Sequence, residues 1–164
     1  MLLIYWPPWI WKSTIWATLA HMEWKTHIDT DQVFVGKYGD IARYMVDRWE
    51  DEFRKREWEI LQDCLSRWNA IITLGGWTLL RPENQVLADR SWNLITLMAD
   101  IETIVNRIMK DTKNTRPLIS TETDIRNLMA ERYAHYISQQ VIYNIWKSES
   151  PEDIASKIQQ LYIR

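Results

Sequence analysis

The chain has 164 residues, a formal net charge of −2 and 46% hydrophobic residues, which suits one domain with its own core. There is no basic excess of the kind that nucleic-acid surfaces need, and the apolar runs are too short to span a bilayer. Cys64 is the only cysteine, so an internal disulfide and a cysteine-based metal cluster are excluded. The chain opens without a secretory-signal pattern, and we expect a cytoplasmic protein without a membrane or nucleic-acid partner.

Short apolar runs alternate with helical patterns along the whole chain. In chain order the pattern predicts a strand at 2–5, a helix at 12–22, a strand at 27–29, helices at 40–47 and 51–67, a strand at 70–74, a helix at 82–89, a strand at 94–98, a helix at 101–110, a loop at 111–120, a helix at 122–139, a strand at 141–143 and a helix at 151–162. This alternation predicts an α/β fold with a mainly parallel five-stranded sheet and helices on both faces. In such sheets ligands bind beyond the carboxyl ends of the strands.

The segment after the first predicted strand carries a phosphate-binding pattern in which tryptophans replace glycines. Residues 6–14 read W-P-P-W-I-W-K-S-T, and glycine at 6, 9 and 11 would make them an ordinary P-loop. In that loop, backbone N–H groups and a helix N-terminus bind phosphates, Lys12 would bridge the β- and γ-phosphates, and Ser13 would bind Mg²⁺. The alternative for this segment alone is an aromatic-rich turn before an accidental Lys-Ser-Thr helix start.

Five further motifs follow in the sequence, and each alone is equally explained by a turn or a solvated helix face. They are I-D-T-D at 28–31, F-R-K-R-E at 53–57, L-G-G-W at 74–77, R-P-L at 116–118 and E-R-Y-A-H-Y at 131–136. Together with the P-loop pattern, their order and spacing resemble the shikimate kinase family over almost the full length. The resemblance implies a single three-layer P-loop kinase domain over 1–164, with substrate-binding helices at about 33–67 and a lid loop at about 111–120.

The resemblance also implies an activity, which is transfer of the ATP γ-phosphate to the 3-hydroxyl of shikimate with Mg²⁺, in aromatic amino-acid biosynthesis. The implied catalytic residues are Lys12, Asp31 and Arg116. The implied ATP-binding residues are Trp9, Trp11, Lys12, Ser13, Thr14 and Arg116. The implied substrate-binding residues are Asp31, Arg54, Gly75, Gly76 and Arg132, and the implied metal-binding residues are Ser13 and Asp29. Size and family together favour a monomer.

Tryptophan stands at an unusual set of positions, since the chain holds 11 Trp and only 4 Gly. The family pattern has glycine where this chain has Trp6, Trp9, Trp11 and Trp77, and glycine would also be natural in place of Trp16, Trp24, Trp49, Trp68 and Trp92. Our hypothesis is that most of these residues are glycine in the natural protein and that a UGA codon has been read as tryptophan. Restoring them would bring the glycine content near the usual ~7%.

If the tryptophans are real, indoles at 9 and 11 would occupy the space that the phosphates need. The chain would then be an impaired kinase or a non-catalytic P-loop binding protein. A kinase for another small acid, such as gluconate, is the remaining alternative, because side-chain identity alone does not fix the substrate.

Overall fold

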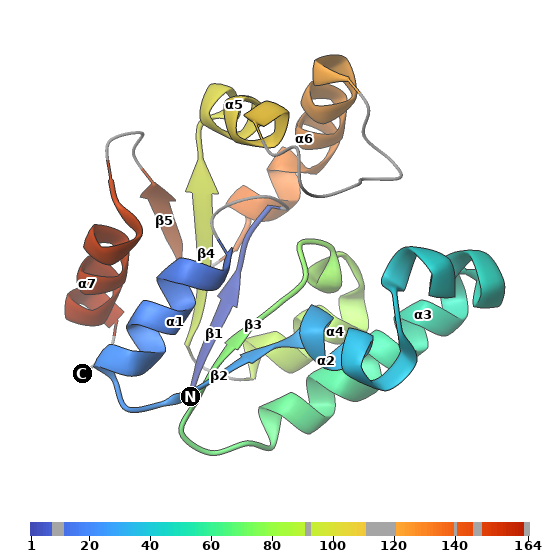
Figure 1. Ribbon diagram of the computed structural model, residues 1–164, viewed down its shortest axis with the longest axis horizontal. Helices are drawn as coiled ribbons and strands as arrows, with labels where there is room; N and C mark the ends of the chain where they lie inside the picture. The colour runs from blue at the N-terminus through green and yellow to red at the C-terminus, as the bar shows by residue number, and fades with distance from the viewer. Residues whose placement is uncertain (8–11, 91–92, 111–120, 140, 146–148, 163–164) are drawn as a thin grey trace.

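The computed structural model describes residues 1–164 apart from 8–11, 91–92, 111–120, 140, 146–148 and 163–164 (Figure 1). Its elements in chain order are β1 Leu2–Tyr5, α1 Lys12–Met22, β2 Thr26–Asp29, α2 Thr30–Tyr38, α3 Ile41–Leu65, β3 Ala70–Thr73, the 3₁₀ turn η1 Thr78–Leu80, α4 Pro82–Asp89, β4 Leu94–Ala99, α5 Ile101–Lys110, α6 Glu122–Ile137, β5 Ile142–Ile145 and α7 Pro151–Tyr162.

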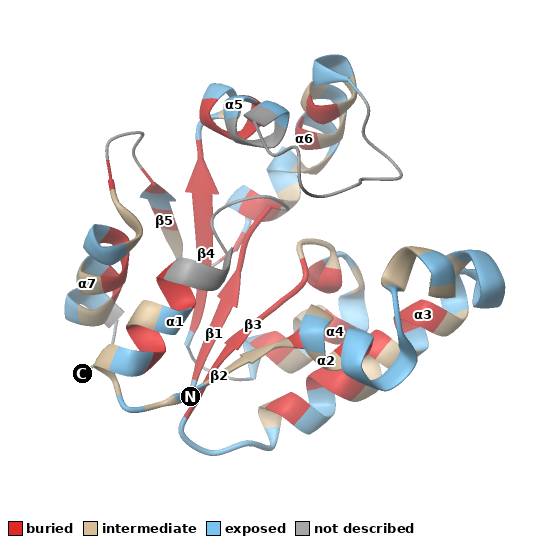
Figure 2. Ribbon diagram, viewed as in Figure 1, coloured by how far each residue is buried: buried red, intermediate tan, exposed pale blue. Residues whose placement is uncertain are grey.

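The strands form one five-stranded sheet in the order β2-β3-β1-β4-β5. All four strand pairs are parallel, which confirms the predicted α/β class. In β1, β3 and β4 every residue is buried, as the red strands of Figure 2 show. These strands read as continuous apolar runs because helices cover both faces of the sheet.

The helices divide between the two faces according to the direction of each crossover. The chain runs from β1 outward to β2 through α1, and then returns across the sheet through α3, α4 and α6. Since parallel crossovers are right-handed, α1 lies on the face opposite to those three helices. The closing helix α7 packs against α1 on its face, and Figure 1 draws α1 across the strands and α7 beside β5.

The largest difference from the sequence prediction is helix α2, which the apolar pattern did not indicate. It begins directly after β2 because the Asp29 carboxylate accepts hydrogen bonds from the backbone N–H groups of Asp31 and Gln32, which is N-terminal capping. The helices predicted at 40–47 and 51–67 are the two helical stretches of α3, which meet at a kink at the non-helical Trp49, as the prediction of two separate helices implied. Smaller differences are that α6 ends at Ile137 and β5 reaches Ile145.

Two of the tryptophans at predicted glycine positions lie in the core. Trp6 follows β1 and Trp16 lies in the second turn of α1, and both are 1% exposed. Their rings stack with centroids 5.1 Å apart and planes at 6°, in the offset or parallel geometry that aromatic pairs adopt in cores. The stacked indoles therefore pack the N-terminal half of α1 against the end of β1.

Candidate active site

Two predicted substrate-binding arginines from different helices meet at one side chain. Arg54 of α3 and Arg132 of α6 both face the indole of Trp77, with their Cζ atoms 5.9 Å and 4.3 Å from the ring centroid. Trp77 directly precedes η1 in the connection that follows β3. The fold thus brings together two guanidinium groups that are far apart in the sequence, beyond the carboxyl end of a central strand.

The Arg54 side chain is held in place by carboxylates of its own helix. Its Nη1 donates to Oε2 of Glu57 at 3.0 Å, and its Nη2 donates to Oε1 of Glu50 at 3.1 Å. Glu57 is buried, and its Oε1 accepts a hydrogen bond of 2.8 Å from the hydroxyl of Thr78. Burial raises the pKa of Glu57, while the nearby Arg54 opposes that shift. This pair links α3 to the turn after β3.

The same turn approaches Asp31, the predicted catalytic carboxylate. A Cβ atom at Gly75 would lie 2.6 Å from Oδ1 of Asp31 and 3.0 Å from Oγ1 of Thr78, so only glycine allows the two segments to come this close. The Gly75 N–H donates to the hydroxyl of Thr30 at 3.2 Å, and that hydroxyl donates to the carbonyl of Thr73. The start of α2 is therefore fixed against the end of β3.

The Gly76 carbonyl is held by two phenols. Tyr5 donates to it at 3.0 Å and Tyr136 at 2.7 Å. Nε2 of His135 lies 3.2 Å from the Tyr5 hydroxyl, and because Tyr5 donates to Gly76, His135 is the donor in this contact. Burial raises the pKa of both phenols, which keeps them protonated, and burial lowers the pKa of His135. The carbonyl is thus fixed from β1 and from α6.

One continuous chain of contacts therefore joins the described substrate-side residues. It runs from Asp31 through the turn at Gly75 and Gly76 to Arg54 on one side and Arg132 on the other. Chemically, the arrangement offers a carboxylate that can accept a proton from a hydroxyl and two guanidinium groups that suit an anionic carboxylate. Together, the carboxylate and the two guanidinium groups can bind a small hydroxylated acid.

The comparisons with known proteins agree with this geometry. The shikimate kinase family profile matches residues 11–162. The chain belongs to the shikimate kinase family. The shikimate kinase of Enterococcus faecalis is 32% identical over 152 residues, which cover 91% of this chain and 90% of the relative. That of Francisella tularensis subsp. holarctica is 36% identical over 132 residues, which cover 77% and 74% respectively.

Solved structures give the same result. A shikimate kinase from Acinetobacter baumannii in complex with shikimate has a TM-score of 0.83 at 26% identity, over 98% of this chain and 92% of that one. A shikimate kinase from Bacteroides thetaiotaomicron has the same fold, with a TM-score of 0.85 at 19% identity over 98% and 97% of the two chains. The protein therefore has the P-loop kinase fold and belongs to a family of ATP-dependent phosphotransferases.

The structure describes only part of the predicted nucleotide-binding region of this chain. Helix α1 begins at Lys12, within the segment 6–14 that carries the P-loop pattern, as the resemblance implies. Trp9, Trp11 and Arg116 lie outside the described residues, as does the lid predicted at 111–120, and so do the side chains of Lys12, Ser13 and Thr14. Their predicted roles stay predictions.

Asp29 has a structural task besides its predicted metal role. Its Oδ1 caps α2 by accepting from the N–H groups of Asp31 and Gln32 at 2.9 Å and 3.2 Å. Its second oxygen has no hydrogen bond within the described part of the chain, and Mg²⁺ often takes only one or two protein carboxylates, with phosphates and waters completing its shell. The donor set fits such an ion. The described residues include no group of three His, Cys, Asp or Glu side chains placed to hold a metal by themselves.

Sequence reasoning gave no role to several residues that organise the site. Glu57 and Tyr136 stand within the quoted family motifs, yet their contacts with Arg54 and with the Gly76 carbonyl come only from the fold. Tyr5 was predicted only as part of a buried strand. Its hydroxyl reaches the turn because β1 ends between β3 and β4, and no sequence spacing signals that contact.

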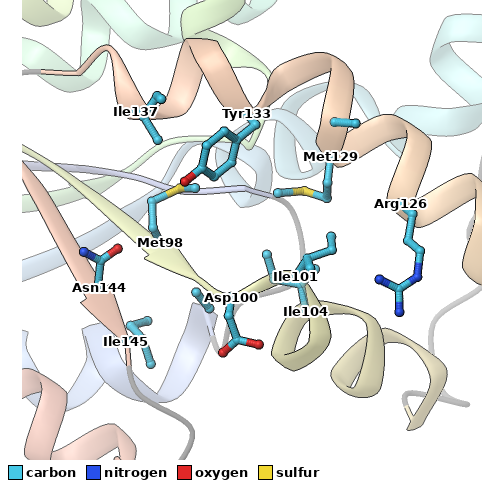
Figure 3. A pocket seen from close by; sticks show the side chains of 12 residues that line it. Met98, Asp100, Ile101, Ile104, Arg126, Met129, Tyr133, Ile137, Asn144 and Ile145 are labelled. Carbon is cyan, nitrogen blue, oxygen red and sulfur yellow. The ribbon is translucent and has the colours of Figure 1, made fainter.

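A pocket of about 620 Å³ lies between α5, α6 and the ends of β4 and β5 (Figure 3). Its lining is mostly apolar, with Met98, Met129 and Tyr133 among the side chains that point into it. Arg132 and Tyr133 are neighbours on α6, but Arg132 lies against Trp77 and Tyr133 lines this pocket. None of the predicted site residues that the structure describes lines it. No helix in the described part of the chain is long and apolar enough to cross a bilayer.

Proposed function

We propose that this chain transfers the γ-phosphate of ATP to the 3-hydroxyl of shikimate. The observation that carries the proposal is the meeting of Arg54, Arg132 and Asp31 around one turn beyond the sheet, in a chain of the shikimate kinase family. Two cations suit the carboxylate of the acceptor, and one anion suits its hydroxyl. The described relative from Acinetobacter baumannii, which carries shikimate, supports the choice of acceptor.

The acceptor side divides its work among four groups. Arg54 and Arg132 would hold the shikimate carboxylate with guanidinium forks, which orients the ring. Asp31 would accept the proton as the 3-hydroxyl oxygen forms its bond to the γ-phosphorus. Gly75 and Gly76 would let the backbone approach the ring closely, because neither carries a side chain. Helices α2 and α3, over about 33–67, would form the acceptor-binding part of the domain.

The nucleotide side would use the residues that open α1. Lys12 would hold the β- and γ-phosphates while the bond between the γ-phosphorus and the bridging oxygen breaks and ADP leaves. Thr14 and the backbone of residues 9 and 11 would contact the phosphates. Arg116, in a lid at 111–120, would offset the charge that develops in transfer. Ser13, with Asp29 acting through water, would hold Mg²⁺, which neutralises phosphate charge when bound.

A coupled ADP-release assay tests the proposal on the chain with glycine at positions 6, 9, 11 and 77. ADP release should depend on shikimate and be much slower with gluconate. Asp31→Asn should lower kcat on the order of 10²–10⁴-fold, whereas Asp89→Asn on the surface should not. Arg132→Leu should raise KM on the order of 100-fold, whereas Arg126→Leu, on the same helix but paired with Glu102 and Glu122, should not. Shikimate-independent ADP release, or a preference for gluconate, would rule the proposal out.

A further inference from the structure

We propose that the side chain of residue 77 controls entry of the acceptor carboxylate, and that the indole present there blocks the site. This inference rests on the proposed function, because the site in question is the arginine pair assigned to the acceptor. It concerns a group that the family pattern does not have, since the corresponding residue is glycine in that pattern.

The Trp77 ring lies against both arginines. Arg54 and Arg132 approach the same indole from two helices, with Cζ-to-centroid distances of 5.9 Å and 4.3 Å. A cation is attracted to an aromatic face, so the ring occupies the position next to Arg132 that an anion would otherwise take. A carboxylate and the indole therefore compete for the same guanidinium group.

Hydrogen-bond donors are in excess around Trp77 and Arg132. Nη1 of Arg132 and Nε1 of Trp77 are both buried, and neither has a hydrogen-bond partner among the described residues. Arginine and indole can only donate, and a buried donor without an acceptor is costly. Arg54 differs because Glu57 and Glu50 accept its hydrogen bonds. The acceptor that is missing beside Arg132 is what an anionic ligand supplies.

The backbone does not require any particular residue at position 77. Trp77 has φ −119° and ψ 0°, angles that non-glycine residues adopt, so exchange for glycine relieves no left-handed strain. The hydrogen bonds of Tyr5 and Tyr136 go to the carbonyl of Gly76 and do not involve the ring. Trp77→Gly therefore removes the indole and leaves the contacts of the turn in place.

The test is calorimetric titration of the full chain and of its Trp77→Gly variant with shikimate and, separately, with cyclohexene-1-carboxylate as a simple ring carboxylate. Both ligands should bind the variant about tenfold more tightly or better, since the cation–π contact no longer has to be displaced. Trp68→Gly, which changes a ring that is 95% exposed, is the matched control and should change neither affinity. Adding Arg132→Met to Trp77→Gly should abolish the gain.

The outcomes separate this inference from the proposed function. Equal affinities of the parent and Trp77→Gly for both ligands would overturn the inference. A gain that survives Arg132→Met would also overturn it, because the ring would then act elsewhere. If the simple carboxylate gains affinity in the variant but shikimate is never phosphorylated by the glycine-restored chain, the inference stands and the proposed substrate is wrong.

A different observation supports a second inference, which is that residues 24 and 49 are glycine in the protein made by the source organism. Trp24 has φ 52°, and Trp49 has φ 67° with ψ 153°. Bulky residues rarely adopt the first conformation, and the second falls in a region that is essentially restricted to glycine. The two indoles are 88% and 81% exposed, so packing does not compensate. Among described residues, the other non-glycine with positive φ is Asn69, a type that tolerates it.

Codons and peptide masses test this second inference directly. We expect UGA at positions 24 and 49 in the gene, and glycine at both in peptides from the protein purified from its own organism. Trp58 is the matched control because it lies in a helical stretch of α3, where glycine would be unfavourable, and we expect UGG and tryptophan there. UGG at position 24 or 49, or tryptophan in the native peptides, would overturn the inference.

Discussion

Tryptophan has different consequences in the turn after β3, residues 74–77 (the acceptor turn), and in two exposed bends, at Trp24 after α1 and at Trp49 in α3 (the surface turns). Trp77 has an ordinary backbone conformation, and its ring lies against Arg132, so its cost is to ligand binding. Trp24 and Trp49 have positive φ and rings that face solvent, so their cost is to the free energy of folding. The comparison predicts that tryptophan at a family glycine position damages ligand binding at one place and stability at another, depending on what surrounds it.

The largest effect should come from removing the carboxylate that holds the acceptor turn. Glu57→Ala should lower the free energy of unfolding by about 3 kcal/mol, because Arg54 is 8% exposed and would lose its buried partner. Glu59→Ala two residues along removes a partly exposed pair with Arg56 and should cost about 0.5 kcal/mol. Denaturant unfolding of both variants measures the difference, and equal losses would show that the turn does not depend on the buried pair.

The surface turns should respond in the opposite direction. Trp49→Gly should raise the free energy of unfolding by about 1–2 kcal/mol, because relief of the positive-φ strain exceeds the extra chain entropy of glycine. Trp68→Gly is the control, since that residue is even more exposed than Trp49 but does not have a positive φ, and it should give no gain. A Trp49→Gly variant that is less stable than the parent would contradict the strain argument.

The phenols of the acceptor turn should give a smaller loss. Tyr136→Phe leaves the Gly76 carbonyl with Tyr5 as its single phenol donor, and should lower the free energy of unfolding by about 1 kcal/mol. Tyr133→Phe on the same helix changes a half-exposed phenol that lines the apolar pocket and should be neutral. Denaturant midpoints compare the two, and a neutral Tyr136→Phe would mean that Tyr5 alone fixes the carbonyl.

Much of the fold could be predicted from the sequence because its signals are local. Four residues of continuous apolar sequence mark β1, and Ser150 and Pro151 mark the start of α7. Helix α2 escaped because its residues, T-D-Q-V-F-V-G-K-Y, have no clear apolar face and include Gly36. Its formation depends on the Asp29 cap and on packing of Phe34 against Phe53, and neither is visible in the local pattern.

The candidate site was predictable in its members and not in its contacts. The family motifs indicated Asp31, Arg54 and Arg132, and the strand ends indicated where they would meet. The indole between the arginines could not be predicted, because a glycine position carries no information about where a ring would point. The contact of Tyr5 with Gly76 could not be predicted either, because it joins residues that are 71 positions apart in the chain.

The smallest effect should be a pH dependence of the free energy of unfolding that arises from His135. Burial lowers the pKa of His135, so the folded chain binds this proton less readily than the unfolded chain. Its contribution to stability is complete above the ordinary histidine pKa of about 6.5 and is lost as the pH falls through that value toward the lowered one. When the pH is lowered from above to below that value, the denaturant midpoint of His135→Gln should therefore fall less than that of the parent. His27, whose pKa burial also lowers, should leave a residual dependence, and an unchanged dependence in His135→Gln would show that burial of His135 does not couple its proton to folding.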